Sequence, residues 1–128
     1  MRKGFTLIEL IVSIAILVIA VFGVNELLTQ GVSAARRAEK LTVSVNIAQA
    51  QIETILSLQY ATLPVGTYEA RHLVFEKYAR QTTINYIDPN TLQTTTQNTG
   101  LKKINTTVYY PLPNGEKSYT LSTIITEQ

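Results

Sequence analysis

The sequence predicts an α+β fold in which one long N-terminal helix packs on a small antiparallel sheet of about three strands. The chain has 128 residues, of which 45% are hydrophobic and 16% are charged, yet no ionisable side chain lies between Leu10 and Val24. After Leu63 the composition shifts to threonine, tyrosine and β-branched residues that alternate with polar ones, as is typical of strands. A helix with an apolar stripe covers one face of such a sheet.

The first element is the apolar run from Phe5 to Val24, whose exceptions are Thr6, Glu9, Ser13 and Gly23. As a helix, this run measures about 30 Å, the thickness of the hydrocarbon core of a bilayer. Arg2 and Lys3 precede the run, so we expect the N-terminus in the cytoplasm and the rest of the chain on the far side. Residues 5–24 are therefore predicted to span a membrane.

Two other kinds of segment share this apolarity. A buried core helix is disfavoured because small domains seldom hide so long an uninterrupted apolar run. A secretory signal peptide ends in a cleavage site of small residues, whereas Asn25, Glu26 and Leu27 continue the helical pattern. Glu9 lies inside the apolar segment, where a carboxylate costs about 2–3 kcal/mol to insert, so its presence indicates a function.

The residues around Glu9 form a motif. The chain begins Met1-Arg-Lys-Gly-Phe-Thr-Leu-Ile-Glu-Leu-Ile-Val, which resembles the class III signal sequence of type IV pilins and type II secretion pseudopilins. That family has a short basic leader, a glycine, usually a phenylalanine, and then Thr-Leu-x-Glu. The resemblance implies that prepilin peptidase cleaves between Gly4 and Phe5 and methylates the new amino group of Phe5. It also implies that Glu9 acts in filament assembly.

The domain organisation follows from this motif and from the pattern after it. Residues 1–4 are expected to be a leader that is removed, and residues 5–24 a transmembrane and filament-core helix. Residues 25–58 are expected to be an amphipathic helix half, and residues 59–128 a β-rich C-terminal head. One helix of roughly 80 Å is predicted from about Phe5 to about Ser57. Its expected apolar stripe recurs at helical spacing and comprises Leu41, Val45, Ala48, Ile52 and Ile55.

Two features of the helix bear on the kind of pilin. Major pilins commonly carry a proline midway along this helix, and the segment from Phe5 to Leu58 has none, which favours a minor pilin or a pseudopilin. The stretch Ala48-Gln-Ala-Gln-Ile-Glu-Thr-Ile is similar to the end of the long helix in minor pseudopilin I and in V-type minor pilins. Taken as ordinary helix residues, Gln49, Gln51 and Glu53 are expected to be exposed.

Three alternating segments after the helix predict strands. Residues 78–87 form the first, with Thr82, Ile84 and Tyr86 on one face, and Asp88-Pro89-Asn90 then turns the chain. A polar loop over residues 91–100 follows. Residues 104–110 and 119–125 are the other two strands, joined by a hairpin at Asn114-Gly115. The hairpin pattern Lys-Ile-x-x-x-Val-x-Tyr resembles the C-terminal end of the same minor-pilin group.

The head shows no pattern of a catalytic, cofactor or metal site. The chain has one histidine and no cysteine, and His72 is expected at the surface of a connecting region beside Arg71. The carboxylates are scattered, and Asp88 with Asn90 is the only local oxygen-rich pair for the calcium that some major pseudopilins hold. No phosphate loop, serine-hydrolase motif or zinc signature occurs. We therefore expect no enzyme, no cofactor and no metal.

The leading interpretation is a minor pilin or pseudopilin of a type IV pilus or a type II secretion pseudopilus. Its expected partners are other pilins, prepilin peptidase, the inner-membrane assembly platform and membrane lipid before assembly. Nucleic acid is not expected, because a net charge of +2 is mild. The protein would cross the cytoplasmic membrane once, with its head in the periplasm or outside the cell. Alternatives are a major pilin of a thin or DNA-uptake filament, and a signal-anchored ligand-binding module.

Overall fold

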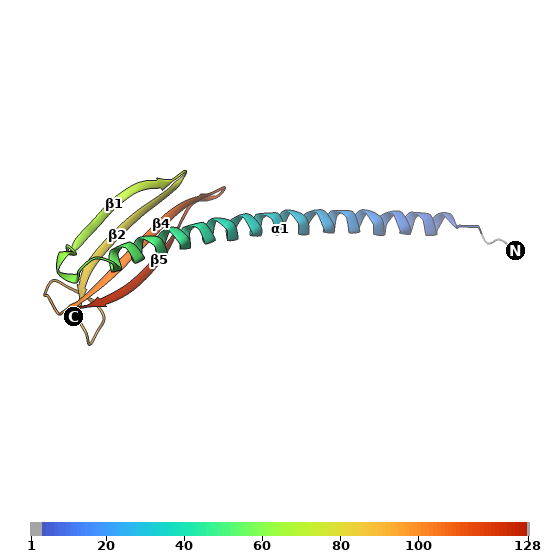
Figure 1. The fold of residues 1–128 in the computed structure, drawn as a ribbon. Coiled ribbons are helices and arrows are strands. Elements are labelled where there is room, and N and C mark those ends of the chain that lie inside the picture. Colours follow the sequence, from blue (N-terminus) through green and yellow to red (C-terminus); the bar gives the residue numbers. More distant parts are fainter. Residues whose placement is uncertain (1–3, 128) are drawn as a thin grey trace. The chain divides into compact units, whose positions relative to one another are not determined.

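The computed structural model describes residues 4–127, so Arg2 and Lys3 of the predicted leader lie outside the described residues. The chain divides into two compact units, Met1–Ala38 and Glu39–Gln128, and each is described by itself. The helix α1 (Leu7–Leu56) supplies most of the first unit and the beginning of the second (Figure 1). The predicted long helix is therefore confirmed.

The first unit is the N-terminal part of α1. Every described residue from Gly4 to Ala38 is exposed, including large apolar side chains such as Leu7 and Phe22. Among residues 4–127, α1 is the one helix long and apolar enough to cross a membrane, and none of its most apolar window is buried. Such a surface is stable in lipid or against other apolar helices rather than in water.

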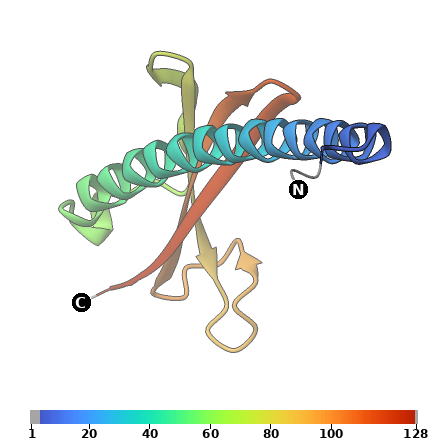
Figure 2. The same ribbon diagram turned by 90° about the vertical axis from the view of Figure 1, so that its right-hand side faces the viewer.

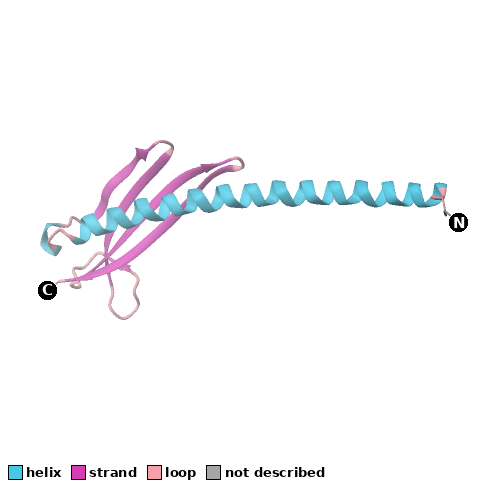
Figure 3. Ribbon diagram, turned by 45° about the vertical axis from the view of Figure 1, so that its right-hand side comes forward, coloured by secondary structure: helices cyan, strands magenta, loops and turns pink. Residues whose placement is uncertain are grey.

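The second unit contains the rest of α1, the short 3-10 helix η1 (Tyr60–Thr62) and one antiparallel sheet. The strands occur in the order β1-β2-β4-β5, and the short β3 pairs with the end of β2. The part of α1 after Glu39 lies across one face of this sheet (Figures 2 and 3). The strands are β1 (Gly66–Phe75), β2 (Tyr78–Ile87), β3 (Thr94–Thr95), β4 (Leu101–Leu112) and β5 (Gly115–Thr126).

The sheet has five strands rather than the three expected from the sequence, because β1 and β3 were not predicted. β1 is an edge strand whose residues are mostly exposed, and its register with β2 shifts three times. Bulges of this kind break the period of two on which a strand prediction depends. The expected connecting region around His72 is therefore wrong, since His72 lies within β1.

The core between α1 and the sheet consists of two clusters of buried residues. Ile52 and Ile55 of α1 pack with Leu63, Ile84 and Ile104 in one cluster. The other comprises Ala48, Tyr78, Val108 and Tyr110. The inner face expected for β2 is confirmed at Thr82 and Ile84, which are fully buried, but not at Tyr86, which is half-buried while its neighbour Ile87 is fully buried.

The predicted apolar stripe of α1 is correct at its C-terminal end and wrong at its start. Leu41 is 41% exposed, whereas Ser44 is fully buried on the same turn of the helix. The buried face of α1 runs through Ser44, Ala48, Gln51 and Ile55 at spacings of four, three and four residues. Gln51 was expected at the surface, but it is buried because it lies on this same face, next to Ile52.

Two lysines connect β4 to other elements of the head, one to α1 and the other to the segment around η1. Lys102 of β4 is only 3% exposed, and its Nζ donates hydrogen bonds to the carbonyl oxygens of Tyr60 at 2.9 Å and Leu63 at 2.8 Å. Burial lowers the pKa of Lys102. At the other end of β4, the strand supplies the acceptor: Lys40 Nζ of α1 donates to the carbonyl oxygen of Pro111 at 2.7 Å. These contacts lie near the two ends of β4.

The edge of the sheet at β1 carries an ion pair. Arg80 donates to Glu69 through Nε at 2.8 Å and through Nη2 at 2.7 Å, and His72 Nε2 lies 3.3 Å from Glu69 Oε1. Desolvation alone raises the pKa of Glu69, but the hydrogen bonds and charge of Arg80 outweigh it. The pKa of Glu69 therefore lies below its usual value.

The head should lose stability as acid protonates Glu69. Because the pKa of Glu69 is lower in the folded chain than in the unfolded chain, its stabilisation is present above the unfolded pKa. That stabilisation is lost as the pH falls through the folded pKa. Between about pH 5 and about pH 3, we expect the melting temperature of the wild type to fall further than that of Glu69→Gln. Thermal melts of both proteins at matched ionic strength measure this difference, and equal losses would contradict the role of the ion pair.

Candidate functional site

The start of α1 holds the residues predicted to be processed and assembled. Gly4, Phe5 and Thr6 precede the helix, and Phe5 is 74% exposed. A peptide bond outside regular structure is open to a peptidase, so the bond between Gly4 and Phe5 is accessible. A Cβ added to Gly4 would meet no atom within 4 Å. The fold of this chain therefore does not itself require a glycine at this position.

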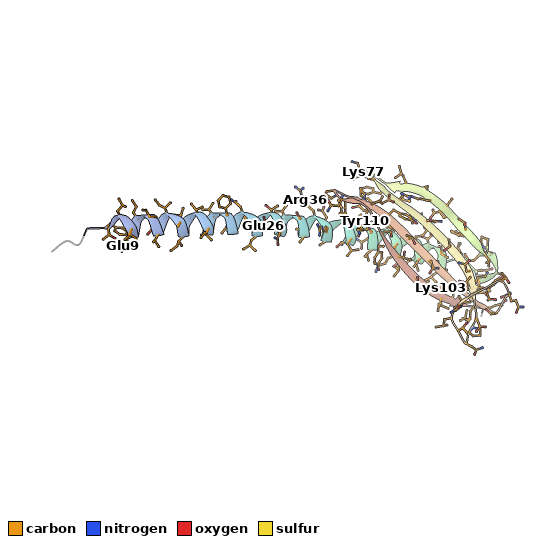
Figure 4. The ribbon with its side chains drawn as sticks, turned by 180° about the vertical axis from the view of Figure 1, so that it is seen from behind. Glu9, Glu26, Arg36, Lys77, Lys103 and Tyr110 are labelled. Carbon is orange, nitrogen blue, oxygen red and sulfur yellow. The ribbon has the colours of Figure 1, made fainter. Side chains whose placement is uncertain are left out.

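Glu9 caps the N-terminus of its own helix, and it is labelled at that end in Figure 4. Its Oε2 accepts hydrogen bonds from the backbone N–H of Thr6 at 3.5 Å and from the Thr6 hydroxyl at 3.4 Å. In return, Thr6 Oγ1 accepts from the N–H of Glu9 at 3.4 Å. This reciprocal arrangement is a capping box, and a carboxylate in the first turn also complements the helix dipole.

The capping box is a feature that the sequence interpretation missed, although its signature was present. Thr6-Leu-Ile-Glu9 has the Ser/Thr-x-x-Glu spacing that marks a helix start. The hydroxyl of Ser13 donates to the carbonyl oxygen of Glu9 at 2.7 Å, so three polar residues share one face of the first turns. Glu9 therefore has a local structural role besides any role in assembly.

The charge of Glu9 has no counter-ion among the residues that the structure describes. Glu9 is the only ionisable side chain from Gly4 to Asn25. Within the described part of the chain, the ion pairs join Arg71 to Glu116 and Glu69 to both His72 and Arg80, and none includes Glu9. A cation that neutralises Glu9 in apolar surroundings must therefore come from a group other than the described side chains of its own chain.

The other residues singled out in the sequence lie in the head. Asp88 Oδ1 accepts from the N–H groups of Asn90 at 2.7 Å and Thr91 at 3.1 Å, which confirms the predicted turn. Nδ1 of His72 lies 3.0 Å from the carbonyl oxygen of Ala70. Over residues 4–127, no three histidine or carboxylate side chains gather in a group that could hold a metal ion.

Comparison with known families identifies the N-terminal segment. A family model described as the prokaryotic N-terminal methylation motif matches residues 1–25. Searches among curated proteins and among solved structures gave no significant match. The matched segment contains Gly4, Phe5 and Glu9 and runs into the apolar part of α1. The match supports a pilin-type protein of the type IV pilin-like family, with a leader that is processed by prepilin peptidase and an assembly partner among other pilins.

Proposed function

We propose that this chain is a minor pilin or pseudopilin subunit of a type IV pilus or a type II secretion pseudopilus. The observation that carries the proposal is the match of the methylation motif to residues 1–25. In this proposal, prepilin peptidase cleaves between Gly4 and Phe5 and methylates Phe5, and Glu9 acts in assembly. The exposed apolar surface of α1 supports it, because such a surface packs against similar helices in a filament. The proposal assigns no catalytic role, cofactor or metal to the chain.

The proposed path of the protein begins in the cytoplasmic membrane. The precursor spans it once, with the N-terminus in the cytoplasm and the head in the periplasm or outside the cell. Removal of residues 1–4 takes away Arg2 and Lys3, which accounts for the whole formal side-chain charge of +2. A mature subunit without net side-chain charge packs closely beside others. The assembly platform in the inner membrane would then move the helix from lipid into the filament.

An unbroken helix favours a minor subunit over a major pilin. α1 runs from Leu7 to Leu56 without a proline, so it lacks the residue that commonly loosens the helix of major pilins. Mass spectrometry of sheared filaments distinguishes the two candidates. A filament composed mainly of this chain would contradict the minor role and favour the major pilin.

A signal-anchored ligand-binding module is the candidate of a different class. In that case the span would stay in the membrane and the leader would remain attached. N-terminal sequencing of the protein purified from membranes separates the two functions. An intact Met1 in cells that contain prepilin peptidase would favour the anchored module, whereas a methylated Phe5 would support the pilin subunit.

A Gly4→Val variant tests the proposed cleavage directly. Because the fold leaves open space around Gly4, a requirement for glycine would come from the peptidase, whose site must approach the backbone closely. We expect the variant to stay at precursor size on a gel, with cleavage reduced by at least about tenfold. Gly23→Val is the matched control, because it makes the same change within α1, and should be cleaved normally. Normal cleavage of Gly4→Val in the native host would contradict the assigned site.

A further inference from the structure

β5 forms one edge of the sheet, because the strand order is β1-β2-β4-β5. The N–H of Glu127 donates to the carbonyl oxygen of Gly100 at 2.9 Å and so continues the ladder between β5 and β4. In an antiparallel pair, alternate residues direct both backbone groups toward the partner strand. The backbone N–H and C=O groups of the odd-numbered residues of β5 therefore point toward β4. Those with their N–H and C=O groups on the open edge are Glu116, Ser118, Thr120, Ser122, Ile124 and Thr126.

This open edge lacks the features that normally prevent strands from pairing with it. No charged residue and no proline occurs between Lys117 and Glu127. The register with β4 is continuous from Gly115 to Thr126, so no bulge twists the edge away. The opposite edge, β1, has three register shifts and carries several charged side chains. Because natural sheets usually protect long edges, the contrast indicates that β5 is kept available for a partner strand.

A hollow of about 610 Å³ lies beside the C-terminal end of β5. Two of its apolar side chains, Leu56 and Leu58, are 49% and 43% exposed, and Glu127 is its only charged lining residue. When a strand is added to a sheet edge, main-chain hydrogen bonds give affinity and pockets for alternate side chains give specificity. The lining comes from the end of α1, η1 with its flanks, and the end of β5, and comprises Ile55, Leu56, Leu58, Gln59, Tyr60, Ala61, Ile125, Thr126 and Glu127.

We infer that β5 is a docking edge for an extended segment of a neighbouring filament subunit, which joins the sheet as a further strand. The segment places an apolar side chain in the hollow and a basic side chain near Glu127. Its middle is uncharged, because the strand from Ser118 to Thr126 offers no charge to pair with it. The inference rests on the proposed function, since it requires that the chain enters filaments.

Hydrogen exchange tests the inference without any substitution. The mature chain is compared in detergent micelles and in filaments sheared from cells, with exchange resolved residue by residue by mass spectrometry. We expect the even-numbered amides from Ser118 to Thr126 to exchange at least about tenfold more slowly in filaments. The odd-numbered amides, which already bond to β4, should be protected in both samples. Equal exchange of the even-numbered amides in the two samples would overturn the inference.

An Ile124→Pro variant provides a second test. Proline removes one N–H from the open edge and leaves the ladder to β4 intact, whereas Ile124→Val keeps that N–H and serves as the control. We expect the amount of Ile124→Pro in filaments to fall about tenfold, while Ile124→Val stays near the wild-type amount. A folded Ile124→Pro protein that enters filaments at the wild-type level would overturn the inference. If this variant does not fold, the exchange measurement decides.

The outcomes also separate this inference from the proposed function. Absence of the wild-type chain from filaments would contradict both together. Presence of a methylated chain in filaments with an unprotected β5 edge would contradict the docking edge alone.

Discussion

A Glu9→Val variant should be inserted into the membrane and cleaved like the wild type, yet fail to enter filaments. Insertion becomes easier by about 2–3 kcal/mol once the carboxylate is gone. Among assembled helices, the proposed partner of Glu9 is the amino group of processed Phe5, on the same chain or on a neighbour. Removal of one member of a buried pair leaves the other unpaired, which costs about 3–5 kcal/mol. Incorporation should therefore fall by more than about a hundredfold.

Two further variants separate the charge of Glu9 from its capping role. Thr6→Ala removes the hydroxyl of the capping box and keeps the charge, so it should still assemble. Glu9→Gln keeps an oxygen that can cap the helix and removes the charge, so it should fail like Glu9→Val. The measurement is co-purification with sheared filaments, alongside a gel that shows mature size. If Thr6→Ala failed and Glu9→Gln assembled, the capping box would be the function of Glu9 and the pairing role would be wrong.

An Ile104→Ala variant should destabilise the head strongly. Ile104 is fully buried in the cluster that joins α1 to the sheet, so truncation removes apolar contacts and leaves a cavity. We expect the free energy of unfolding to fall by about 3 kcal/mol, which lowers the melting temperature by roughly 12–24 °C for a domain of this size. All seven tyrosines lie after Leu58, so near-ultraviolet circular dichroism of the full chain in detergent reports on the head.

Ile124→Ala is the matched control for this stability measurement. Ile124 is the same residue type in the neighbouring strand, but it is 46% exposed. Its truncation in a monomeric sample should change stability by no more than about 0.5 kcal/mol. Equal losses from Ile104→Ala and Ile124→Ala would show that the packing of α1 on the sheet does not determine the stability of the head.

The elements that the sequence predicted well have strong local patterns. The apolar run and good helix formers predicted α1, and clear alternation from Tyr78 predicted β2 with its ends. The turn at Asn114-Gly115 predicted the hairpin of β4 and β5, although both strands extend closer to the turn than expected. β1 was missed because an exposed, bulged edge strand leaves no regular pattern of apolar residues.

The features that the sequence did not predict depend on distant parts of the chain. Lys102 lies on the same face of β4 as Ile104, yet a lysine in sequence is expected in solvent. Its burial depends on the carbonyl groups of Tyr60 and Leu63, which only the folded chain brings to it. Likewise, Gly4, Phe5 and Glu9 were found through a local motif, whereas the open edge of β5 follows from the strand order.

The contacts that Lys40 and Lys102 make near the two ends of β4 have a mechanical consequence. Lys40 reaches from the helix to Pro111, and Lys102 reaches from the sheet to Tyr60 and Leu63 at the opposite end of the same strand. Lys40 holds α1 at one end of β4, and Lys102 holds the segment that follows α1 at the other end, so a pull along the helix acts on both ends of the strand. We therefore expect the head to resist tension along α1 as one unit, a property that the proposed role in a filament would require.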